Sequence, residues 1–339
     1  MITNKTILIT GVCGFLGHHV VEYFLEHTNY DIIGIDKLSY ASFGLRRLQD
    51  IYVLNNPRFT LHIYDLMTEF DIGFVNELKH VDIILHLAAE THVDNSISDP
   101  IKCITNNVIS TLNLLELARK IKPSQFIYFS TDEVYGNAEK NQIFTENDRH
   151  NPMNPYSASK SSSEMICKSY YNTYKVPLII CNTMNIFGER QHYEKFIPKC
   201  ISKILKGEEI QIHSYPFKEG ENPESGSRFY IYAKDVAASL NFVIDKGIIG
   251  ETYNILSNKE VKNDFLCKQI ASILNKEVKI KYIDYDPNRP GNDLRYCLCD
   301  KKLKDMGWEN EDNFYGYLKH TVQWTLNNQN WLSDDVYKK

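Results

Sequence analysis

The sequence predicts an α/β protein built on a doubly wound parallel sheet, followed by a smaller α/β lobe. Short apolar runs alternate with helix-length amphipathic segments through the first half of the chain, which is typical of repeated strand-helix-strand units. A glycine-rich turn joins the first strand to the first helix. The length of 339 residues allows an enlarged domain or two lobes. Together these features favour an open sheet with helices on both faces.

The first strand, turn and helix are typical of a dinucleotide-binding site. A β-branched run is followed by three regularly spaced glycines, Gly11, Gly14 and Gly17. Glycine keeps the turn tight and lets a pyrophosphate approach the N–H groups and positive dipole of the helix start. The second strand, residues 30–35, ends at Asp36, close to the offset of about 20 residues at which an acid binds an adenosine ribose. A carboxylate there repels a 2′-phosphate, so we predict a Rossmann-type sheet that binds NAD rather than NADP.

Two further strands and a long helix continue the pattern. Residues 59–64 form the third strand, and residues 81–87 run into Ala88 and Ala89, whose small side chains let a flat ring or a diphosphate approach closely. A helix then begins at Pro100. Its apolar side chains recur at helical spacing and predict either core or a dimer face: Ile101, Ile104, Val108, Leu112 and Leu115.

Candidate chemical groups follow the fifth strand, residues 126–129. Asp132 and Glu133 stand side by side where this apolar strand ends, the edge at which open α/β sheets bind their ligands. A solvated acidic loop is the alternative. Tyr156 and Lys160 are four residues apart, so on a helix they share one face, where an ammonium beside a phenol favours the phenolate. An ordinary surface tyrosine and lysine are the alternative.

The chain changes character in its second half, where elements become shorter and turns more frequent. We therefore expect residues 1–188 to form mainly the NAD-binding domain. Residues 189–339 should form mainly a smaller ligand-binding lobe, with some segments returning to the sheet. Residues 217–227 combine glycines with charges and predict an exposed loop.

Composition narrows the range of partners. The net charge of -5 disfavours a nucleic-acid partner, since binding a phosphate backbone needs an excess of Lys and Arg on one face. No apolar run approaches membrane-span length and no signal-like segment opens the sequence, so we expect a cytoplasmic protein without a membrane partner. The eight cysteines are scattered, which favours reduced thiols. Cys297 and Cys299 lack the second pair that a metal site needs, so we predict no metal.

Several motifs together resemble the extended short-chain dehydrogenase/reductases over nearly the whole chain. The glycine turn and the Tyr156-Ser157-Ala158-Ser159-Lys160 segment carry this resemblance. Within that family the sequence is similar to the nucleotide-sugar 4,6-dehydratases at residues 36–41, 87–94, 130–136 and 289–296. The Asp132–Glu133 pair discriminates, because related epimerases and decarboxylases tend to carry Ser or another residue in place of Asp132.

The resemblance implies dehydration of a nucleotide-diphosphate hexose, with dTDP-glucose as the expected substrate. Oxidation at C4 by NAD acidifies the C5 proton, water is eliminated across C5 and C6, and the hydride returns to C6. Tyr156 would take the C4 hydroxyl proton, Lys160 would lower the pKa of Tyr156 and hold the nicotinamide ribose, and Thr131 would hydrogen-bond near that hydroxyl. Glu133 would be the base at C5, and Asp132 the acid that protonates the departing C6 hydroxyl.

The resemblance also implies binding residues. For NAD they are Gly11, Gly14, Phe15, Leu16, Gly17, Asp36, Lys37, Leu38, Ser39, Asp65, Leu66, Leu87, Ala88, Ala89, Asn106, Tyr156, Lys160 and Asn182. For the nucleotide sugar they are Thr91, His92, Thr131, Asn185, Lys195, Gln211, His213, Arg228, Asn263, Arg289 and Asn292. A surface ion pair is the alternative for each charged residue of this second set. Departures from the family pattern cluster on the substrate side, such as Asn95 in place of Arg and Glu189 in place of Pro.

Three alternative functions stay open at this point. The substrate could be UDP-glucose or another NDP-hexose. The chain could instead be a nucleotide-sugar 4-epimerase or decarboxylase, which shares Tyr156 and Lys160, or a non-catalytic NAD-binding sensor. The helices that begin at Pro100 and Pro155 resemble those through which the family dimerises, so we expect a homodimer.

Overall fold

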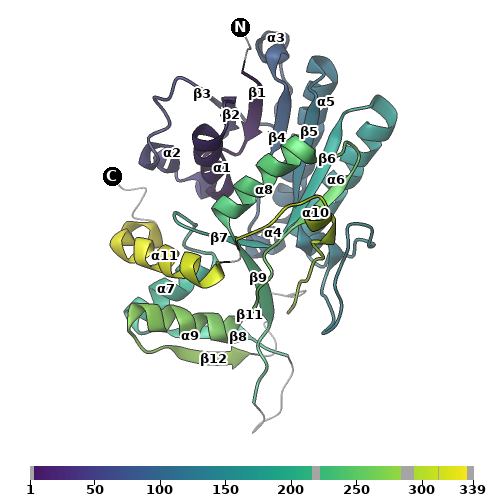
Figure 1. The fold of residues 1–339 in the computed structure, drawn as a ribbon. Coiled ribbons are helices and arrows are strands. Elements are labelled where there is room, and N and C mark those ends of the chain that lie inside the picture. The colour runs from purple at the N-terminus through teal and green to yellow at the C-terminus, as the bar shows by residue number, and fades with distance from the viewer. Residues whose placement is uncertain (1–3, 216–221, 284–293, 312, 334–339) are drawn as a thin grey trace.

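The computed structural model describes residues 4–215, 222–283, 294–311 and 313–333, and it confirms the predicted doubly wound α/β fold (Figure 1). Parallel strands form a seven-stranded sheet in the order β10-β6-β5-β4-β1-β2-β3. These strands are β1 (Thr6–Thr10), β2 (Asp31–Asp36), β3 (Phe59–Ile63), β4 (Ile83–His86), β5 (Gln125–Thr131), β6 (Leu178–Thr183) and β10 (Thr252–Ile255). The strand order reverses between β1 and β4. Such a switch point is where open α/β sheets bind ligands.

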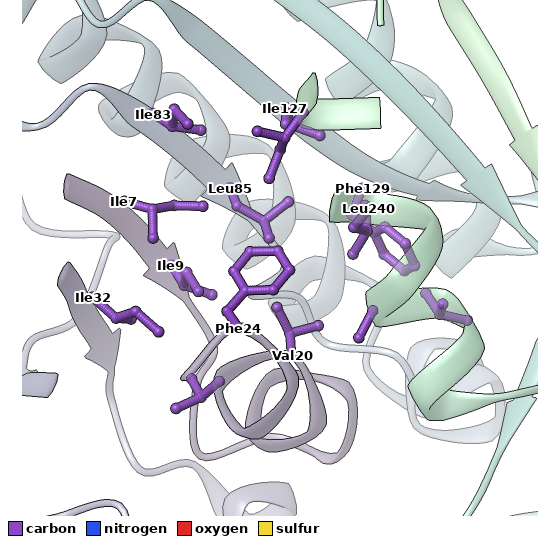
Figure 2. Packing of buried hydrophobic residues seen from close by; sticks show 14 of the residues in the cluster. Ile7, Ile9, Val20, Phe24, Ile32, Ile83, Leu85, Ile127, Phe129 and Leu240 are labelled. Carbon is purple, nitrogen blue, oxygen red and sulfur yellow. The ribbon is translucent and has the colours of Figure 1, made fainter. Parts of the chain in front are cut away.

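Helices cover both faces of this sheet. One face packs against α1 (Phe15–His27) and α8 (Ala233–Lys246), and the other against α5 (Pro100–Ile121) and α6 (Pro155–Tyr174). Figure 2 shows Phe24 of α1 and Leu240 of α8 among the side chains that pack on the sheet. Because both faces are covered, every residue of β1 and β4 is buried, which is why each strand has three consecutive apolar residues rather than an alternating pattern.

A smaller α/β lobe lies beside the sheet (Figure 1). Its strands form a three-stranded sheet of β7 (Asn185–Phe187), β9 (Ser227–Tyr232) and β11 (Glu260–Lys262), and a parallel pair of β8 (Glu209–His213) and β12 (Lys279–Ile283). A separate hydrophobic core joins them to α7 (Phe196–Lys206), α9 (Asn263–Leu274) and α11 (Phe314–Asn327). The short helices are α2 (Arg46–Asp50), α3 (Ile72–Glu77), α4 (Val93–Ser98), α10 (Lys301–Asp305) and the 3₁₀ turns η1 (Tyr40–Ser42), η2 (Leu78–His80), η3 (Asp132–Tyr135) and η4 (Gln329–Leu332).

The fifth strand extends past its predicted end at residue 129. Its pairing with β6 continues through Ser130 opposite Asn182 and Thr131 opposite Thr183, so β5 ends at Thr131. The two acidic residues therefore do not lie in an open loop. They form the start of η3, directly at the carboxyl end of the sheet.

The prediction of an exposed loop over residues 217–227 is wrong at its C-terminal end. Residues 217–221 lie outside the described part of the chain. Ser225, Gly226 and Ser227 are buried, and Ser227 begins β9. A Cβ built on Gly226 would lie 2.6 Å from the carbonyl oxygen of Leu294, so this segment packs tightly against its neighbour.

The exposed face of α5 is apolar at its start. Ile101 is 78% exposed and Ile104 39% exposed, whereas Leu115 is fully buried. The first two side chains therefore lie outside the core of this chain, which leaves the dimer face as their predicted role.

All eight cysteines are free, and all but Cys299 are buried. In the described ranges no helix is both long and apolar enough to span a membrane.

Candidate active site

A cavity of about 330 Å³ lies at the carboxyl ends of the strands, around the switch point between β1 and β4. It brings together most of the predicted site. The predicted residues that line it are Gly11, Gly14, Phe15, Leu16, Gly17, Asp36, Lys37, Ser39, Asp65, Leu66, Leu87, Ala88, Ala89, Thr91, His92, Asn106, Thr131, Asp132, Glu133, Tyr156, Lys160, Asn185 and Lys195. They come from both the large sheet and the lobe, so the cavity lies between the two.

The glycine turn fits a dinucleotide diphosphate. Gly11 has a φ of +76°, and a Cβ there would lie 2.9 Å from Cα of Ala88. A Cβ on Gly17 would lie 2.0 Å from the carbonyl oxygen of Gly11, so the turn closes only with glycine. Gly14 caps the 13-residue helix α1, whose first turn carries no acidic side chain. The N–H groups and dipole of this helix start are therefore available to an anion.

Asp36 is held at the end of β2 as a ribose acceptor requires. One carboxylate oxygen accepts a hydrogen bond from the N–H of Cys13 at 2.9 Å, and the other from the N–H of Leu38 at 2.8 Å. Burial raises the pKa of Asp36, while these two N–H donors and the cation of Arg47 oppose the rise. Leu38 itself is not part of the cavity lining. It contributes through its backbone, at a φ of +56°.

A polar network next to Asp36 includes a residue absent from the predicted set. Nζ of Lys37 donates to Oδ1 of Asn106 at 2.5 Å and lies 3.9 Å from Oε1 of Glu90. Nζ of Lys37 also lies 4.0 Å from the carboxylate of Asp65. Glu90 lines the cavity. Its position directly after the two alanines at the end of a strand was the signal that could have identified it.

Asn182 has protein partners in this structure, and its predicted contact with the cofactor stays a prediction. Its side chain is fully buried and lies outside the cavity lining. Nδ2 donates to the hydroxyl of Tyr135 at 3.2 Å and to Oε1 of Glu164 at 3.4 Å. Asn182 thus belongs to a polar cluster beneath the site.

The two adjacent carboxyl groups have different surroundings. Asp132 is 4% exposed; the hydroxyl of Thr131 donates to its Oδ1 at 3.0 Å, and its Oδ2 has no hydrogen-bond partner among the described residues. Burial, and then the charge of Glu133, raises the pKa of Asp132 to about 8. Asp132 is therefore protonated at neutral pH, as a general acid must be.

The side chain of Glu133 points toward the start of α6, the helix that carries Tyr156. Its Oε2 accepts a hydrogen bond from Nδ2 of Asn154 at 3.2 Å. Asn154 is also the N-cap of α6 and forms a capping box with Ser157. Sequence reasoning did not assign Asn154 to the site, although its place just before Pro155 is typical of a cap. The cap thus fixes both the helix that carries Tyr156 and the carboxylate of Glu133.

Tyr156 and Lys160 lie on the first turns of α6, as predicted, and both are buried. Nζ of Lys160 donates to the carbonyl oxygen of Phe129 at 2.7 Å, and burial lowers the pKa of Lys160 to about 8. The pKa of Tyr156 is raised, because burial and the charge of Glu133 outweigh the hydrogen bond with Thr131. Burial and Glu133 thus oppose the phenolate form that a base needs, and the action of Tyr156 as a base, with Lys160 favouring the phenolate, stays a prediction.

The predicted substrate residues divide into two groups. Within the cavity, Nζ of Lys195 donates to the carbonyl oxygen of Thr91 at 3.0 Å, and Nε2 of His92 lies 3.3 Å from Oε2 of Glu194. These contacts join the lobe to the loop after β4. Asn185 also lines the cavity.

The second group lies outside the lining. Arg228 packs 4.6 Å above the ring of Tyr296 and donates to the carbonyl oxygens of Ser227 and Leu294. Its charge still opposes the rise of the Asp132 pKa. Gln211 and His213 lie on β8, and Asn263 begins α9. Arg289 and Asn292 lie outside the described residues.

Comparison with known proteins identifies the family. The GDP-mannose 4,6 dehydratase family matches residues 8–321 of the sequence. The chain belongs to this family. Its relatives include the dTDP-glucose 4,6-dehydratase of Escherichia coli, which is 35% identical over 353 residues, or 96% of this chain and 94% of that protein. The predicted membership among the nucleotide-sugar 4,6-dehydratases of the short-chain dehydrogenase/reductases is thereby confirmed.

Two other members of the family show how far the similarity extends. A trifunctional UDP-glucose 4,6-dehydratase/UDP-4-keto-6-deoxy-D-glucose 3,5-epimerase/UDP-4-keto-L-rhamnose-reductase of Arabidopsis thaliana is 35% identical over 338 residues, which is 98% of this chain. This chain spans 48% of that relative's length, so it covers about half of it. A dTDP-glucose 4,6-dehydratase from Streptomyces venezuelae, solved with NAD bound, has a TM-score of 0.86 and 29% identity, covering 98% of this chain and 100% of that one.

Proposed function

We propose that this chain catalyses the NAD-dependent dehydration of a nucleotide-diphosphate hexose, with dTDP-glucose as the first candidate, to the 4-keto-6-deoxy sugar. One observation carries the proposal. Two adjacent carboxyl groups, Asp132 and Glu133, line the same cavity as Tyr156 and Lys160, and burial raises the pKa of Asp132. An epimerase needs the last two groups but has no water to remove. The predictions of NAD as the cofactor and of a 4,6-dehydratase agree with the family and with its NAD-bound member.

Each side chain has a role that its position supports. NAD, when bound, accepts a hydride from C4 of the hexose and returns it to C6. Tyr156 takes the proton of the C4 hydroxyl, and Thr131 hydrogen-bonds beside it. The C4 ketone makes the C5 proton acidic enough for Glu133 to remove. Asp132 then donates its proton to the C6 hydroxyl, which leaves as water. When hydride is added at C6, Glu133 returns to C5 the proton that it removed, which completes the 4-keto-6-deoxy sugar.

The cofactor and substrate occupy opposite parts of the cavity in this proposal. The start of α1 would hold the diphosphate of NAD, Asp36 would hold its adenosine ribose, and Lys160 would hold its nicotinamide ribose. The sugar nucleotide binds on the lobe side, at Asn185 and Lys195. Contacts from Arg228, Gln211, His213, Asn263, Arg289 and Asn292 remain predictions for the diphosphate and base.

UDP-glucose is the second candidate substrate. The observation in its favour is that the plant relative named for UDP-glucose and the bacterial relative named for dTDP-glucose are equally similar to this chain, at 35% identity each. Overall similarity therefore does not choose the nucleotide.

A panel of substrates tests the proposal. The purified protein is incubated with dTDP-, UDP-, GDP- and CDP-hexoses, and products are analysed by mass spectrometry for loss of water. We expect water loss from at least one of them, and a product that absorbs in alkali as 4-keto-6-deoxy sugars do. An isomer without loss of mass would replace the proposal with epimerisation, and NAD-loaded protein inert toward every hexose would favour the sensor.

We also propose that the protein is a cytoplasmic homodimer and that its NAD-binding and substrate-binding parts divide near residue 188. The exposed Ile101 and Ile104 of α5 supply an apolar patch for a second copy. Ile101→Glu should convert a dimer into a monomer in light scattering. Ile72→Glu is the matched control, because Ile72 is 75% exposed on a different helix, α3. A wild-type monomer at micromolar concentration would contradict the dimer.

A further inference from the structure

A further carboxyl group, that of Glu164, lies on α6 beneath the active site, one helical turn beyond Lys160. Glu164 and Lys160 are four residues apart on α6 and so share one face of the helix. The side chain of Glu164 is 0% exposed. Acidic side chains are almost never buried to this degree unless a specific partner compensates their charge.

The contacts of Glu164 leave it incompletely compensated. Its Oε1 accepts a hydrogen bond from Nδ2 of Asn182 at 3.4 Å. Its Oε2 has no hydrogen-bond partner among the described residues, and Nε2 of His150 lies 3.6 Å away. Burial, followed by the charge of Lys168, lowers the pKa of His150 to about 4, so this imidazole is neutral at pH 7. The nearby cations are therefore lysines.

Glu164 and Lys160 control each other's charge near neutral pH. Burial raises the pKa of Glu164 to about 7, while Ser130, Lys168, Lys160 and Asn182 oppose the rise. Burial lowers the pKa of Lys160 to about 8, and the charge of Glu164 is the largest influence in the opposite direction. The titratable groups around Glu164 are Tyr128, Tyr135, His150, Lys160, Cys167 and Lys168. Of these, Lys160 alone lines the cavity.

A purely structural role explains this arrangement poorly. An unsatisfied buried polar group destabilises the folded state, and a leucine or glutamine would fill the same space without an uncompensated charge. A role at the active site, through Lys160, explains why the carboxylate of Glu164 is present at this buried position. Glu164 also contacts Asn182 at the end of β6, so it connects α6 to the strand next to β5.

We propose that Glu164 is a positioning residue for the dehydration: its buried carboxylate, on the same face of α6 as Lys160, favours the charged ammonium of Lys160 at the cavity. The inference rests on the proposed function, in which Lys160 holds the nicotinamide ribose and supports Tyr156 as a base. Glu164 touches neither ligand and acts only through Lys160.

The test compares pH profiles of Glu164→Gln, Glu164→Asp and the wild type. Gln keeps the shape and the oxygen that accepts from Asn182, but it removes the charge. The control is Glu77→Gln, an exposed carboxylate on α3. We expect the alkaline limb of kcat for Glu164→Gln to move to lower pH by at least about one unit, because Lys160 then loses its proton earlier. Glu164→Asp should shift less, and Glu77→Gln not at all.

A second measurement does not depend on turnover. NADH binding is followed by fluorescence across the same pH range. As the pH is raised, binding should begin to weaken at a lower pH in Glu164→Gln than in the wild type, because Lys160 loses its proton earlier. A uniform loss of kcat with an unshifted profile, or an unchanged pH dependence of NADH binding, overturns the proposal. If Glu164→Gln does not fold, an unshifted profile in Glu164→Asp overturns it. Failure of the wild type to dehydrate any NDP-hexose would instead refute the proposed function, and the NADH titration would still test Glu164.

Discussion

Replacing Asp132 with asparagine separates the elimination step from the oxidation step. Asparagine keeps the volume and an oxygen that can accept the 3.0 Å hydrogen bond from Thr131, but it has no proton to donate to a leaving hydroxyl. In the proposed mechanism, oxidation at C4 depends on Tyr156 rather than on Asp132. We therefore expect Asp132→Asn to reduce its bound cofactor on addition of substrate, and to lose elimination by about 10²–10⁴-fold.

The same substitution should stabilise the protein in a pH-dependent way. The folded protein raises the pKa of Asp132 from 3.8 to about 8, so between these values the folded state holds a proton that the unfolded state has released. The contribution of Asp132 to the stability of the wild type therefore falls as the pH rises from about 4 to 8. At pH 7 about three pH units separate the solution from the unfolded value, which sets an upper bound of about 4 kcal/mol on the cost. Asparagine does not carry this cost.

Three measurements check the prediction. Absorbance of the reduced nicotinamide reports oxidation of the sugar, alkaline absorbance of the product reports elimination, and thermal unfolding between pH 5 and about 9 reports stability. The Tm difference between Asp132→Asn and the wild type should grow with pH and level off above about pH 8. Asp305→Asn, an exposed carboxylate paired with Lys301, is the control and should show no such trend. Normal turnover, or a stability gain independent of pH, would refute the reasoning.

Other substitutions test the remaining parts of the site. Glu133→Gln should abolish exchange of the C5 hydrogen with deuterated solvent and lower turnover by about 10²–10⁴-fold, as measured by mass spectrometry; retained exchange would exclude Glu133 as the base. Tyr156→Phe should leave the cofactor oxidised when substrate is added, because no group then takes the C4 hydroxyl proton, and a normal rise in reduced nicotinamide absorbance would contradict this role. Gly17→Ala places a Cβ 2.0 Å from the carbonyl oxygen of Gly11, so we expect about 1–3 kcal/mol of lost stability in urea unfolding and a lower content of bound NAD. Gly207→Ala, whose Cβ has no atom within 4 Å, should keep its NAD, and equal NAD loss in both variants would argue against the close packing of the glycine turn.

The parts of the fold and site that the sequence predicts are those with a short-range physical signal. The glycine turn, the acid at the end of β2 and the Tyr156–Lys160 spacing each need only local geometry, and the structure places all of them at one cavity. Glu90 and Asn154 have only weak local signals, the end of a strand and a place before a proline, and Glu164 has none. Their roles depend on Lys37, Glu133 and Lys160, which lie elsewhere in the chain or across a helical turn.

The placement of Asn182 shows the limit of reasoning from the end of a strand. Side chains alternate between the two faces along a strand, and Leu178 and Ile180 pack into the core on the side of α5 and α6. Asn182 has the same parity, so it points beneath the site toward Glu164. Asn185, beyond the end of the strand, lines the cavity instead. The sequence shows that β6 ends in polar residues, but only the register of β6 against β5 decides which face each one meets.

The separation of the two acids follows from the turn in which they lie. Thr131 ends β5, and its hydroxyl accepts the N–H of Glu133 as the N-cap of η3. In a 3₁₀ helix there are about three residues per turn, so adjacent side chains point in directions about 120° apart. Asp132 therefore points into the protein, where burial keeps it protonated, while Glu133 points to the amide of Asn154. A solvated loop would give both carboxyls the same surroundings and the same charge. The strand that continues to Thr131 prevents this, and so makes one acid and one carboxylate available for a single elimination.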